Sequence, residues 1–347
     1  MIKNLLLEGF ALKEQGYYKK AIEVFYKALE EDNSSLELLL EIAELYYLIQ
    51  KEERTLNYIE RILDKCPTHV EALKLLEKIF IDKNNLSEAE KTAENIYLIS
   101  RCTSDLVNLL RIMNAQKEYE KVIQYSISQN NTGVNYEIAY AKFHLKNFEE
   151  AEKLTKEVLN QDKDNVEAKL LLGKIYYAEN KLSECSKIAK ELETGILDGE
   201  ILNFLGLVYA QKGFVKKAEE YFINAIKLEK RNDLYYYNLA NFYMTNGKLS
   251  LAQKNYNHAI SLAPENENYH YAMANLHYLN KNYKRALEEI KGDDVNSRLL
   301  KAIILYDTGY YIIARKEIRE ITEQYPENNV AKKYLELLNN QLELKNN

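Results

Sequence analysis

The chain has 347 residues, of which 46% are apolar and 29% are charged, and its formal net charge is −6. Because nucleic-acid binding requires net or strongly clustered positive charge, this acidic balance argues against a general nucleic-acid-binding protein. The three cysteines, Cys66, Cys102 and Cys185, have no paired spacing, which predicts reduced thiols and a cytoplasmic protein.

A small residue recurs along the whole chain at intervals close to 34 residues. The successive intervals are 34, 34, 33, 29, 34, 33, 34, 34 and 28. Self-similarity of this kind predicts a stack of ten similar units rather than one globule around a single core. We name these positions the anchors: Ala21, Thr55, Ala89, Val122, Ala151, Cys185, Ala218, Ala252, Ala286 and Ala314.

Each unit is predicted to be a pair of antiparallel helices that meet at the anchor. In the eighth unit, Tyr236, Ala240 and Tyr243 recur at helical spacing before the anchor. Twelve residues before the anchor, eight of the ten units carry Gly or Ala, which lets two helix backbones approach closely; Glu77 and Leu110 are the exceptions. Glycine is expected to end four of the first helices in left-handed backbone, at Gly16, Gly213, Gly247 and Gly309.

Two of the second helices are predicted to be short. The interval of 29 follows Val122 in the fourth unit, and the interval of 28 follows Ala286 in the ninth. A loss of about five residues removes more than one helical turn. We therefore predict a local change of superhelical pitch near residues 128–136 and 290–298.

The last segment, residues 330–345, is predicted to be one further amphipathic helix. We expect it to cap the final pair, because a terminal repeat needs a polar outer side. Its expected apolar stripe consists of Val330, Tyr334, Leu337, Leu338 and Leu342.

The Gly/Ala, aromatic, Ala and Pro positions at these offsets resemble the tetratricopeptide repeat, most closely in residues 203–230 and 237–266. The resemblance covers about residues 2–329, although the tryptophan usual in this family is absent. It implies an all-α fold, an α-solenoid of about ten antiparallel helix pairs in a right-handed superhelix with a C-terminal capping helix. We expect residues 1–347 to form a single solenoid of this kind.

The resemblance also implies a concave groove lined by the first helices, reached by side chains 15, 11 and 8 residues before each anchor. Spacings of four and three place these positions on one helical face. The middle of the groove then carries a basic and aromatic segment of Lys74, Lys78, Arg111, Tyr136, Tyr140 and Lys174. The later part carries an Asn/Tyr segment of Asn203, Tyr237, Asn241, Tyr271 and Asn275.

These two segments predict a peptide-binding groove. Asparagine carries both a donor and an acceptor, so it pairs with the backbone of an extended peptide with little dependence on sequence. Tyrosine adds rigid contact area at low entropic cost, and the basic residues would select acidic side chains or a free carboxylate. The alternative interpretation is that all these residues belong to an ordinary solvated face.

The sequence shows no catalytic, metal-binding or cofactor-binding motif. His270 and His277 are seven residues apart but have no Cys or carboxylate at metal-ligand spacing, and both His277 and Cys185 occupy packing positions of the repeat. Lys74 and Asn108 resemble part of the carboxylate clamp of chaperone-binding relatives. Glu137 stands where that clamp needs a cation, so the sequence does not predict the clamp.

We therefore expect a non-enzymatic scaffold that binds a peptide or helix of a partner protein in its groove. The alternative is a regulatory or assembly subunit of an enzyme or multiprotein machine that binds through its convex face or its ends, and self-association belongs with this alternative. No stretch approaches the roughly 20 apolar residues of a membrane span, so we expect no membrane insertion.

Overall fold

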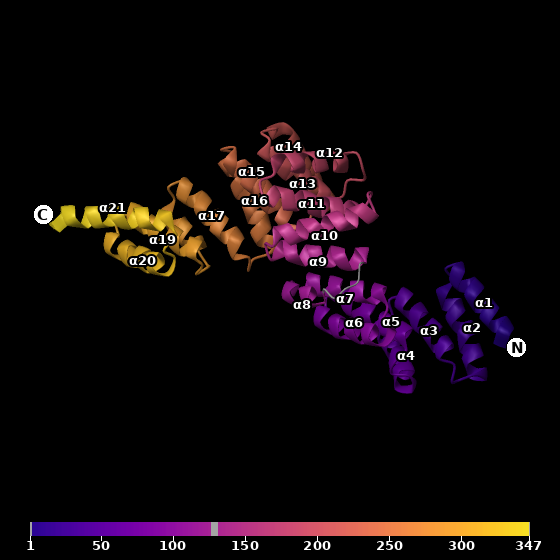
Figure 1. Ribbon diagram of the computed structural model, residues 1–347. Coiled ribbons are helices and arrows are strands. Elements are labelled where there is room, and N and C mark those ends of the chain that lie inside the picture. The colour runs from indigo at the N-terminus through magenta and orange to yellow at the C-terminus, as the bar shows by residue number, and fades with distance from the viewer. Residues whose placement is uncertain (1, 126–130, 347) are drawn as a thin grey trace. The chain divides into compact units, whose positions relative to one another are not determined.

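A computed structural model of the chain describes residues 2–125 and 131–346, with side chains described as far as residue 341. These residues form 21 helices and no strand (Figure 1). The chain divides into two compact units, Met1–Asn180 and Lys181–Asn347, whose boundary lies in the turn after the eleventh helix.

The helices of the first unit follow one another with short turns. They are α1 (Ile2–Glu14), α2 (Tyr18–Glu31), α3 (Leu36–Leu48), α4 (Glu52–Lys65), α5 (Val70–Asp82), α6 (Leu86–Ser100), α7 (Thr103–Ala115), α8 (Tyr119–Gln124), α9 (Thr132–His144), α10 (Phe148–Gln161) and α11 (Val166–Ala178). The second unit has the same organisation. Its helices are α12 (Leu182–Glu193), α13 (Gly199–Gln211), α14 (Val215–Leu228), α15 (Asp233–Thr245), α16 (Leu249–Leu262), α17 (Glu267–Leu279), α18 (Tyr283–Glu289), α19 (Val295–Asp307), α20 (Tyr311–Gln324) and α21 (Asn329–Asn346).

Consecutive helices form pairs, such as α1 with α2 in the first unit and α15 with α16 in the second. Each second helix also packs against the first helix of the next pair, as α2 does against α3 and α14 against α15. The predicted all-α architecture of successive helix pairs is confirmed. A single solenoid over residues 1–347 and its right-handed superhelix stay predictions.

All ten anchors are fully buried, with 0% of each residue exposed. The residues twelve positions earlier are buried as well, from Gly9 in α1 to Ala302 in α19. Small side chains at both positions allow the two helices of a pair to pack closely, as the repeat predicted. The resulting core is a row of contacts between neighbouring helices and not one central cluster.

The turn inside each pair has left-handed backbone at the fifth residue before the anchor. Glycine occupies four of these turns, where φ is 79° at Gly16 and 88° at Gly309. The other six turns adopt the same conformation without glycine, so the geometry of the pair is stronger than the local backbone preference. Their residues are Gln50, Asn84, Lys117, Lys146, Asn180 and Lys281.

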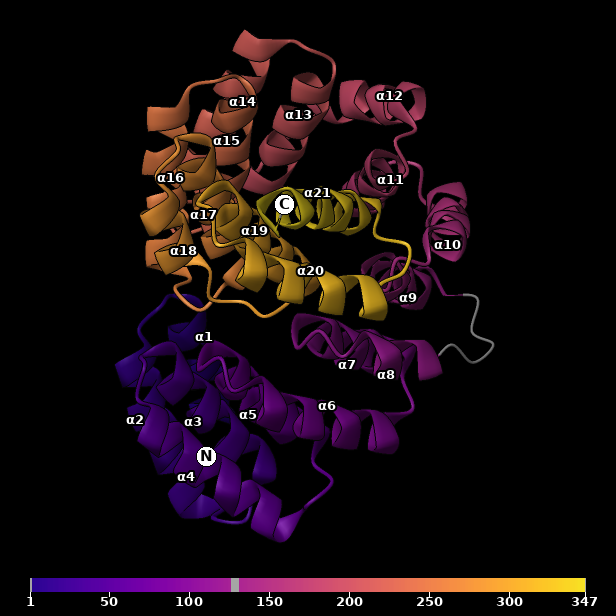
Figure 2. The same cartoon turned by 90° about the vertical axis from the view of Figure 1, so that its left-hand side faces the viewer.

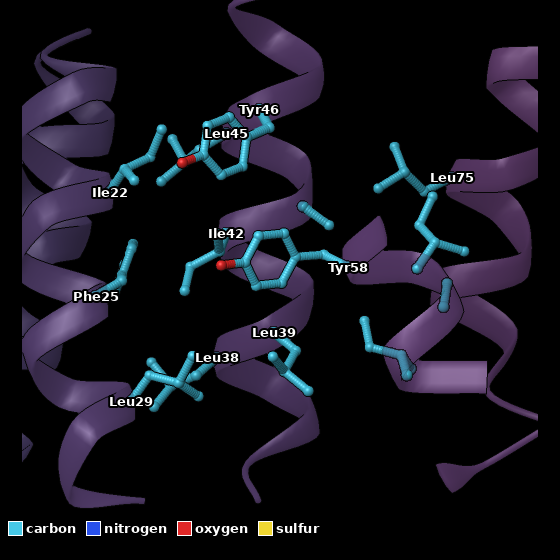
Figure 3. Packing of buried hydrophobic residues seen from close by; sticks show 14 of the residues in the cluster. Ile22, Phe25, Leu29, Leu38, Leu39, Ile42, Leu45, Tyr46, Tyr58 and Leu75 are labelled. Atoms are coloured by element: carbon cyan, nitrogen blue, oxygen red, sulfur yellow. The ribbon is translucent and has the colours of Figure 1, made fainter. Parts of the chain in front are cut away.

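The apolar contact between successive pairs is visible in the first unit (Figure 3). Phe25 and Leu29 of α2 face Leu38 and Ile42 of α3, and all four side chains are buried. Because α2 meets both α1 and α3, each helix pair buries apolar surface on two sides. This is the packing expected of repeats that are not stable alone.

The two short second helices are confirmed. The described part of α8 has six residues and α18 has seven, whereas most other second helices have about fourteen. Beside the short α18, a hollow of about 670 Å³ opens between Leu287, Arg298 and Glu317. The predicted pitch change near 128–136 falls partly on residues 126–130, which lie outside the described residues, and both pitch changes stay predictions.

Helix α21 packs against α20 and α19, as expected of a capping helix (Figure 2). Its contact stripe agrees in part with the predicted one. Leu338 is fully buried and Tyr334 packs against the cluster, as predicted, whereas Val330 and Leu337 are exposed, and Ala331 and Leu335 take part in the contact instead. Leu342 lies outside the described side chains.

Candidate functional site

All eleven predicted groove residues lie on first helices of the pairs. In each unit, first helices also contact one another, as α3 does α5 and α13 does α15. We call the face that they share the inner face of the unit. It carries Lys74 and Lys78 on α5, Arg111 on α7, Tyr136 and Tyr140 on α9, Lys174 on α11, Asn203 on α13, Tyr237 and Asn241 on α15, and Tyr271 and Asn275 on α17.

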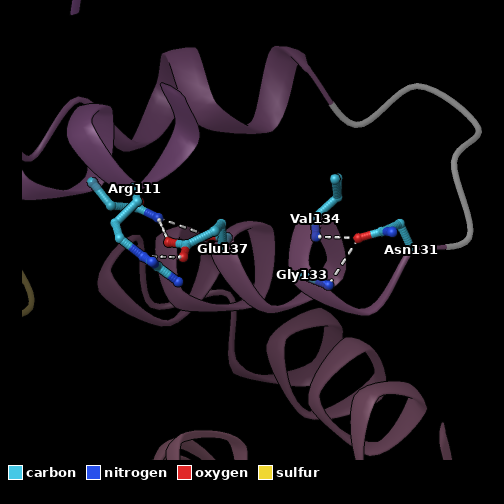
Figure 4. Close-up of polar contacts among 6 residues, drawn as sticks. Arg111, Asn131, Gly133, Val134 and Glu137 are labelled. Atoms are coloured by element: carbon cyan, nitrogen blue, oxygen red, sulfur yellow. Dashed lines mark hydrogen bonds and ion pairs between the residues drawn. The ribbon is translucent and has the colours of Figure 1, made fainter. Parts of the chain in front are cut away.

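In the first unit, two of the predicted cations are already paired with buried acids on the next first helix. Lys74 Nζ lies 2.8 Å from Asp105 Oδ1. Arg111 Nε lies 3.1 Å from Glu137 Oε1, and Figure 4 shows this second contact. Asp105 and Glu137 are buried, while Lys74 and Arg111 extend into solvent. Two of the four cations that the sequence predicted for this stretch are thus compensated by buried acids.

A third buried acid stands at a position where most pairs have Gly or Ala. Glu77 of α5 is buried and accepts a hydrogen bond from Asn108 Nδ2 of α7. Burial raises the pKa of Glu77, and the bond from Asn108 opposes that rise. Glu77, which departs from the Gly or Ala of most pairs, therefore forms a polar link between α5 and α7.

Glu137 is held by two side chains of α7. Asn114 Nδ2 donates to Glu137 Oε2 at 2.8 Å and to its main-chain oxygen at 3.0 Å, beside the Arg111 contact. Burial raises the pKa of Glu137, and its bonds from Asn114 and its attraction to Arg111 only partly oppose that rise. At Asp105 the balance is reversed: burial would raise the pKa, but hydrogen bonds from Lys74 and Ser100 lower it.

The remaining basic and aromatic residues are partly exposed or exposed. The Lys78 ammonium lies over the Tyr47 ring, 4.8 Å from its centre, and the Tyr140 ring lies 4.5 Å from that of His144. Tyr136 and Lys174 are half-buried.

In the second unit, asparagine and tyrosine hold one another in place. Asn238 Nδ2 donates to Asn203 Oδ1 at 3.0 Å, and Asn203 is buried, so this side chain links α13 to α15. The Tyr256 hydroxyl, which comes from the second helix α16, donates to Asn241 Oδ1 at 2.6 Å. This bond fixes the Asn241 amide and leaves its Nδ2 directed away from Tyr256.

A row of tyrosine rings connects α15 to α17. The Tyr237 ring centre lies 4.8 Å from that of Tyr269 and 6.0 Å from that of Tyr256. The Tyr269 hydroxyl donates to Asp233 Oδ2 at 2.6 Å, which fixes one end of the row. Tyr237 and Tyr271 keep part of their surface exposed, as does Asn275.

The histidine pair considered in the sequence has a structural role at one member. His270 is buried, with Nδ1 2.9 Å from Glu289 Oε2 and Nε2 2.9 Å from the main-chain oxygen of Pro264. Among residues 2–125 and 131–346, no group of three or more His, Cys, Asp or Glu side chains is arranged to hold a metal ion. In that same part of the chain, no helix is both long and apolar enough to cross a membrane.

Comparison with protein families identifies the repeat. One tetratricopeptide-repeat model matches residues 143–193, and a second matches residues 2–35, 199–232 and 234–266. No curated protein has a significantly similar sequence.

Two solved structures share the fold at low sequence identity. The crystal structure of the APC/C hetero-tetramer Cut9–Hcn1 matches with a TM-score of 0.63 and 14% identity, over 96% of this chain and 75% of that one. A tetratricopeptide repeat protein from Parabacteroides merdae ATCC 43184 matches with a TM-score of 0.50 and 16% identity, over 78% of this chain and 98% of that one.

The matched repeats begin near the first described residue and recur in both units. Repeats of this kind indicate a protein–protein interaction scaffold, and the proteins built from them are typically non-catalytic. From its repeats and its helix-pair fold, the chain is a tetratricopeptide-repeat protein.

Proposed function

We propose that the protein is a non-enzymatic scaffold that binds an extended segment of a partner protein on the inner face of α13, α15 and α17. The observation that carries this proposal is the bond from Tyr256 to Asn241. Because the carbonyl of the Asn241 amide is already satisfied, its Nδ2 is held as a donor for a main-chain carbonyl of the partner.

The tyrosine row supplies the contact area beside this donor. Tyr237 is fixed by rings on both sides, so it loses little conformational freedom when a partner covers it. Asn275 and Tyr271 present the same residue types one helix further along. The Asn/Tyr segment thus offers an amide donor and an aromatic face on the first helix of each of these two repeats.

The charge pairing in the first unit favours this location over the basic stretch. Lys74 and Arg111 already have carboxylate partners, and a ligand carboxylate would compete with Asp105 and Glu137 for them. We therefore assign the basic stretch of the first unit a secondary role. The net charge of −6 supports a protein partner over a nucleic acid, and the unpaired cysteine spacing supports a cytoplasmic protein.

The test compares variants that keep the Tyr256 bond and lose only the donors. In Asn241→Asp with Asn275→Asp, the carboxylate still accepts from Tyr256, but the Nδ2 donors are replaced by a charge that repels carbonyl oxygens. Partner proteins are first identified by affinity purification from the source cells, and peptides tiled across them are titrated against the purified chain. We expect the double variant to bind about tenfold more weakly, the loss of two hydrogen bonds, with an unchanged melting temperature.

The matched control is Asn257→Asp, an exposed asparagine on the second helix α16. It introduces the same charge change as Asn241→Asp, in the same repeat but away from the inner face. Equal binding by the wild type, the control and the double variant would contradict the assignment of the inner face.

A second candidate function is a regulatory or assembly subunit that binds through its outer face or its ends, with the inner face unoccupied. Exposed apolar residues at the start of α20 favour this candidate, since Ile312 and Ile313 are both exposed on a second helix. Self-association is one form of it. Sedimentation over a concentration series, combined with partner binding by inner-face and α20 variants, distinguishes the two functions.

A further inference from the structure

The first turn of α20 exposes three neighbouring apolar side chains on the second helix of the last pair. Ile312 is 74% exposed, Ile313 is 53% exposed and Tyr310, just before the helix, is 60% exposed. Tyr311 between them is half-buried and packs against Tyr306. An apolar cluster of this kind is more than the scattered exposure of single hydrophobic residues that most surfaces show.

The repeat itself gives no reason for apolar residues at these positions. Ile312 and Ile313 stand two and one residues before the anchor Ala314. In the nine other pairs the same two positions carry polar or charged residues, with Leu251 as the one exception. These residues are Lys19 and Lys20, Glu53 and Arg54, Ser87 and Glu88, Glu120 and Lys121, Glu149 and Glu150, Ser183 and Glu184, Lys216 and Lys217, Ser250 and Leu251, and Lys284 and Arg285.

Two of the three glutamates of α20 are directed toward α19, where one arginine binds them. Arg298 Nη2 lies 3.0 Å from Glu320 Oε2 and 3.3 Å from Glu317 Oε2, and its Nη1 donates to Gln324 at 3.1 Å. Arg298 is mostly covered by these contacts. The carboxylates of Glu317 and Glu320 are therefore compensated on the side of the helix that faces Arg298.

The basic residues of α20 lie on the exposed side with the isoleucines. Arg315, Lys316 and Arg319 follow Ile312 by three, four and seven residues, which places all four on one helical face. All three basic residues are exposed, and the Arg319 contact with Glu323 is a long one of 3.8 Å between exposed groups. The exposed face of α20 thus combines an apolar start with a positively charged continuation.

We infer that this face of α20, formed by Ile312, Ile313, Arg315, Lys316 and Arg319, is a docking surface for a partner segment that carries apolar side chains next to carboxylates. The apolar side chains of the segment would cover the isoleucines, and its carboxylates would meet Arg315, Lys316 and Arg319, of which Arg319 already has a long contact with the exposed Glu323. A second copy of the chain fits this face less well, because two copies placed symmetrically would bring their own basic residues together.

This surface rests on the second candidate function, binding through the outer face, and is independent of the inner-face proposal. It is built on a second helix of the last pair, whereas the inner-face residues lie on first helices from α5 to α17. Failure of either proposal therefore leaves the other intact.

The test uses the full chain and a display library of random 16-residue peptides. Peptides are selected on the wild type and counter-selected on Ile312→Ser with Ile313→Ser. We expect the enriched peptides to combine leucine-like side chains with Asp or Glu, and to lose at least about tenfold in affinity with the double variant. Arg315→Glu with Lys316→Glu should weaken the same peptides and leave apolar contacts in place.

The controls distinguish binding at this surface from nonspecific peptide binding and from binding at the inner face. Lys284→Ser with Arg285→Ser changes the equivalent two positions of the ninth pair and should leave binding unchanged, as should Asn241→Asp with Asn275→Asp. All substituted α20 positions are exposed, so the melting temperature of each variant should equal that of the wild type. If the serine pair does not fold, the loss of peptide binding by Arg315→Glu with Lys316→Glu still tests the surface.

Three results would overturn the inference. The first is a library in which no peptide distinguishes the wild type from the serine pair. The second is enrichment of Lys- or Arg-rich peptides over acidic ones. The third is a wild-type dimer in sedimentation experiments that the serine pair dissociates, which would assign the face to a second copy of this chain.

Discussion

The Phe222 ring of α14 occupies the space that a side chain at Gly206 of α13 would need. A Cβ at Gly206 would lie 2.7 Å from Cδ1 and Cε1 of Phe222, and Phe222 is itself almost completely buried. The same relationship joins Gly9 to Phe25 in the first unit. In these two pairs the small residue makes room for an aromatic ring, so its smallness is a packing requirement of the pair.

Gly206→Ala is expected to destabilise the second unit. In an ordinary helix the change would gain about 1 kcal/mol, but forcing a methyl group against a buried ring costs about 1–3 kcal/mol. Thermal or urea unfolding should show a lower stability for Gly206→Ala, and Phe222→Leu in the same chain should recover part of the loss. A stabilised Gly206→Ala variant would show that the ring moves freely.

Glycine at the left-handed turns should stabilise the pairs that lack it. Lys117 and Lys146 have φ of 63° and 61°, a conformation that costs an L-residue about 1 kcal/mol more than glycine. We expect Lys146→Gly to raise the free energy of unfolding by about 0.5–1 kcal/mol. The reverse change, Gly213→Ala at the equivalent turn, should lower it by a similar amount, as measured by urea unfolding.

Because of Glu137, the free energy of unfolding should increase as the pH falls. Burial raises its pKa in the folded protein above the ordinary value of 4.5, so the folded state binds the proton more tightly than the unfolded state does. Its contribution is complete below about pH 4.5 and is lost as the pH rises through the folded pKa. The stability of the wild type relative to Glu137→Gln should therefore increase from pH 8 to pH 4 in urea titrations.

The exposed Glu149→Gln on α10 is the control for this titration, since it removes a carboxylate of the helix paired with α9 without changing the buried site. If the stability of the wild type relative to Glu137→Gln instead decreases as the pH falls, the contacts with Arg111 and Asn114 lower the pKa of Glu137 more than burial raises it.

The capping role of α21 is tested by two neighbouring leucines. Leu338 is 0% exposed and Leu337 is 37% exposed. Leu338→Ala should cost about 2–4 kcal/mol and reduce hydrogen-exchange protection in α19 and α20, because it removes a buried contact of the last pair. Leu337→Ala should cost less than about 1 kcal/mol. Equal effects of the two substitutions would contradict the observed orientation of the helix.

Tyr256→Phe is expected to weaken partner binding although Tyr256 is fully buried. The change frees the Asn241 amide to rotate, which reduces affinity several-fold, and it costs about 0.5–1.5 kcal/mol of stability. Tyr269→Phe is the matched control, because it removes a hydroxyl bonded to Asp233 and leaves Asn241 fixed. Equal binding by both variants would show that the orientation of Asn241 is unimportant.

The repeat in the sequence predicted the helix pairs, the anchors and the two short second helices. Each of these features depends on residues within a single helix pair. The buried acids were missed because they link first helices of different pairs. Lys74 with Asp105 and Glu77 with Asn108 are each 31 residues apart, as are the more exposed Lys13 and Glu44, and this separation is one repeat less about one helical turn. Arg111 and Glu137 are 26 residues apart.

The separation of 31 residues is a signal that the sequence does contain. Complementary polar residues 31 positions apart on predicted first helices would have indicated that Lys74 was already paired. The orientation of Asn241 had no such signal. It depends on Tyr256, fifteen residues later on the second helix, and on the packing that buries this hydroxyl.

Site-specific photo-crosslinking in the source cells tests the inner-face assignment most directly. A benzophenone amino acid is placed at Tyr237 or Tyr271 on the inner face, and at Glu220 or Lys254 on exposed positions of α14 and α16. We predict that a partner protein crosslinks to positions 237 and 271 and that the second-helix positions give no crosslink to it. Crosslinks to that partner from positions 220 or 254 alone would contradict the account.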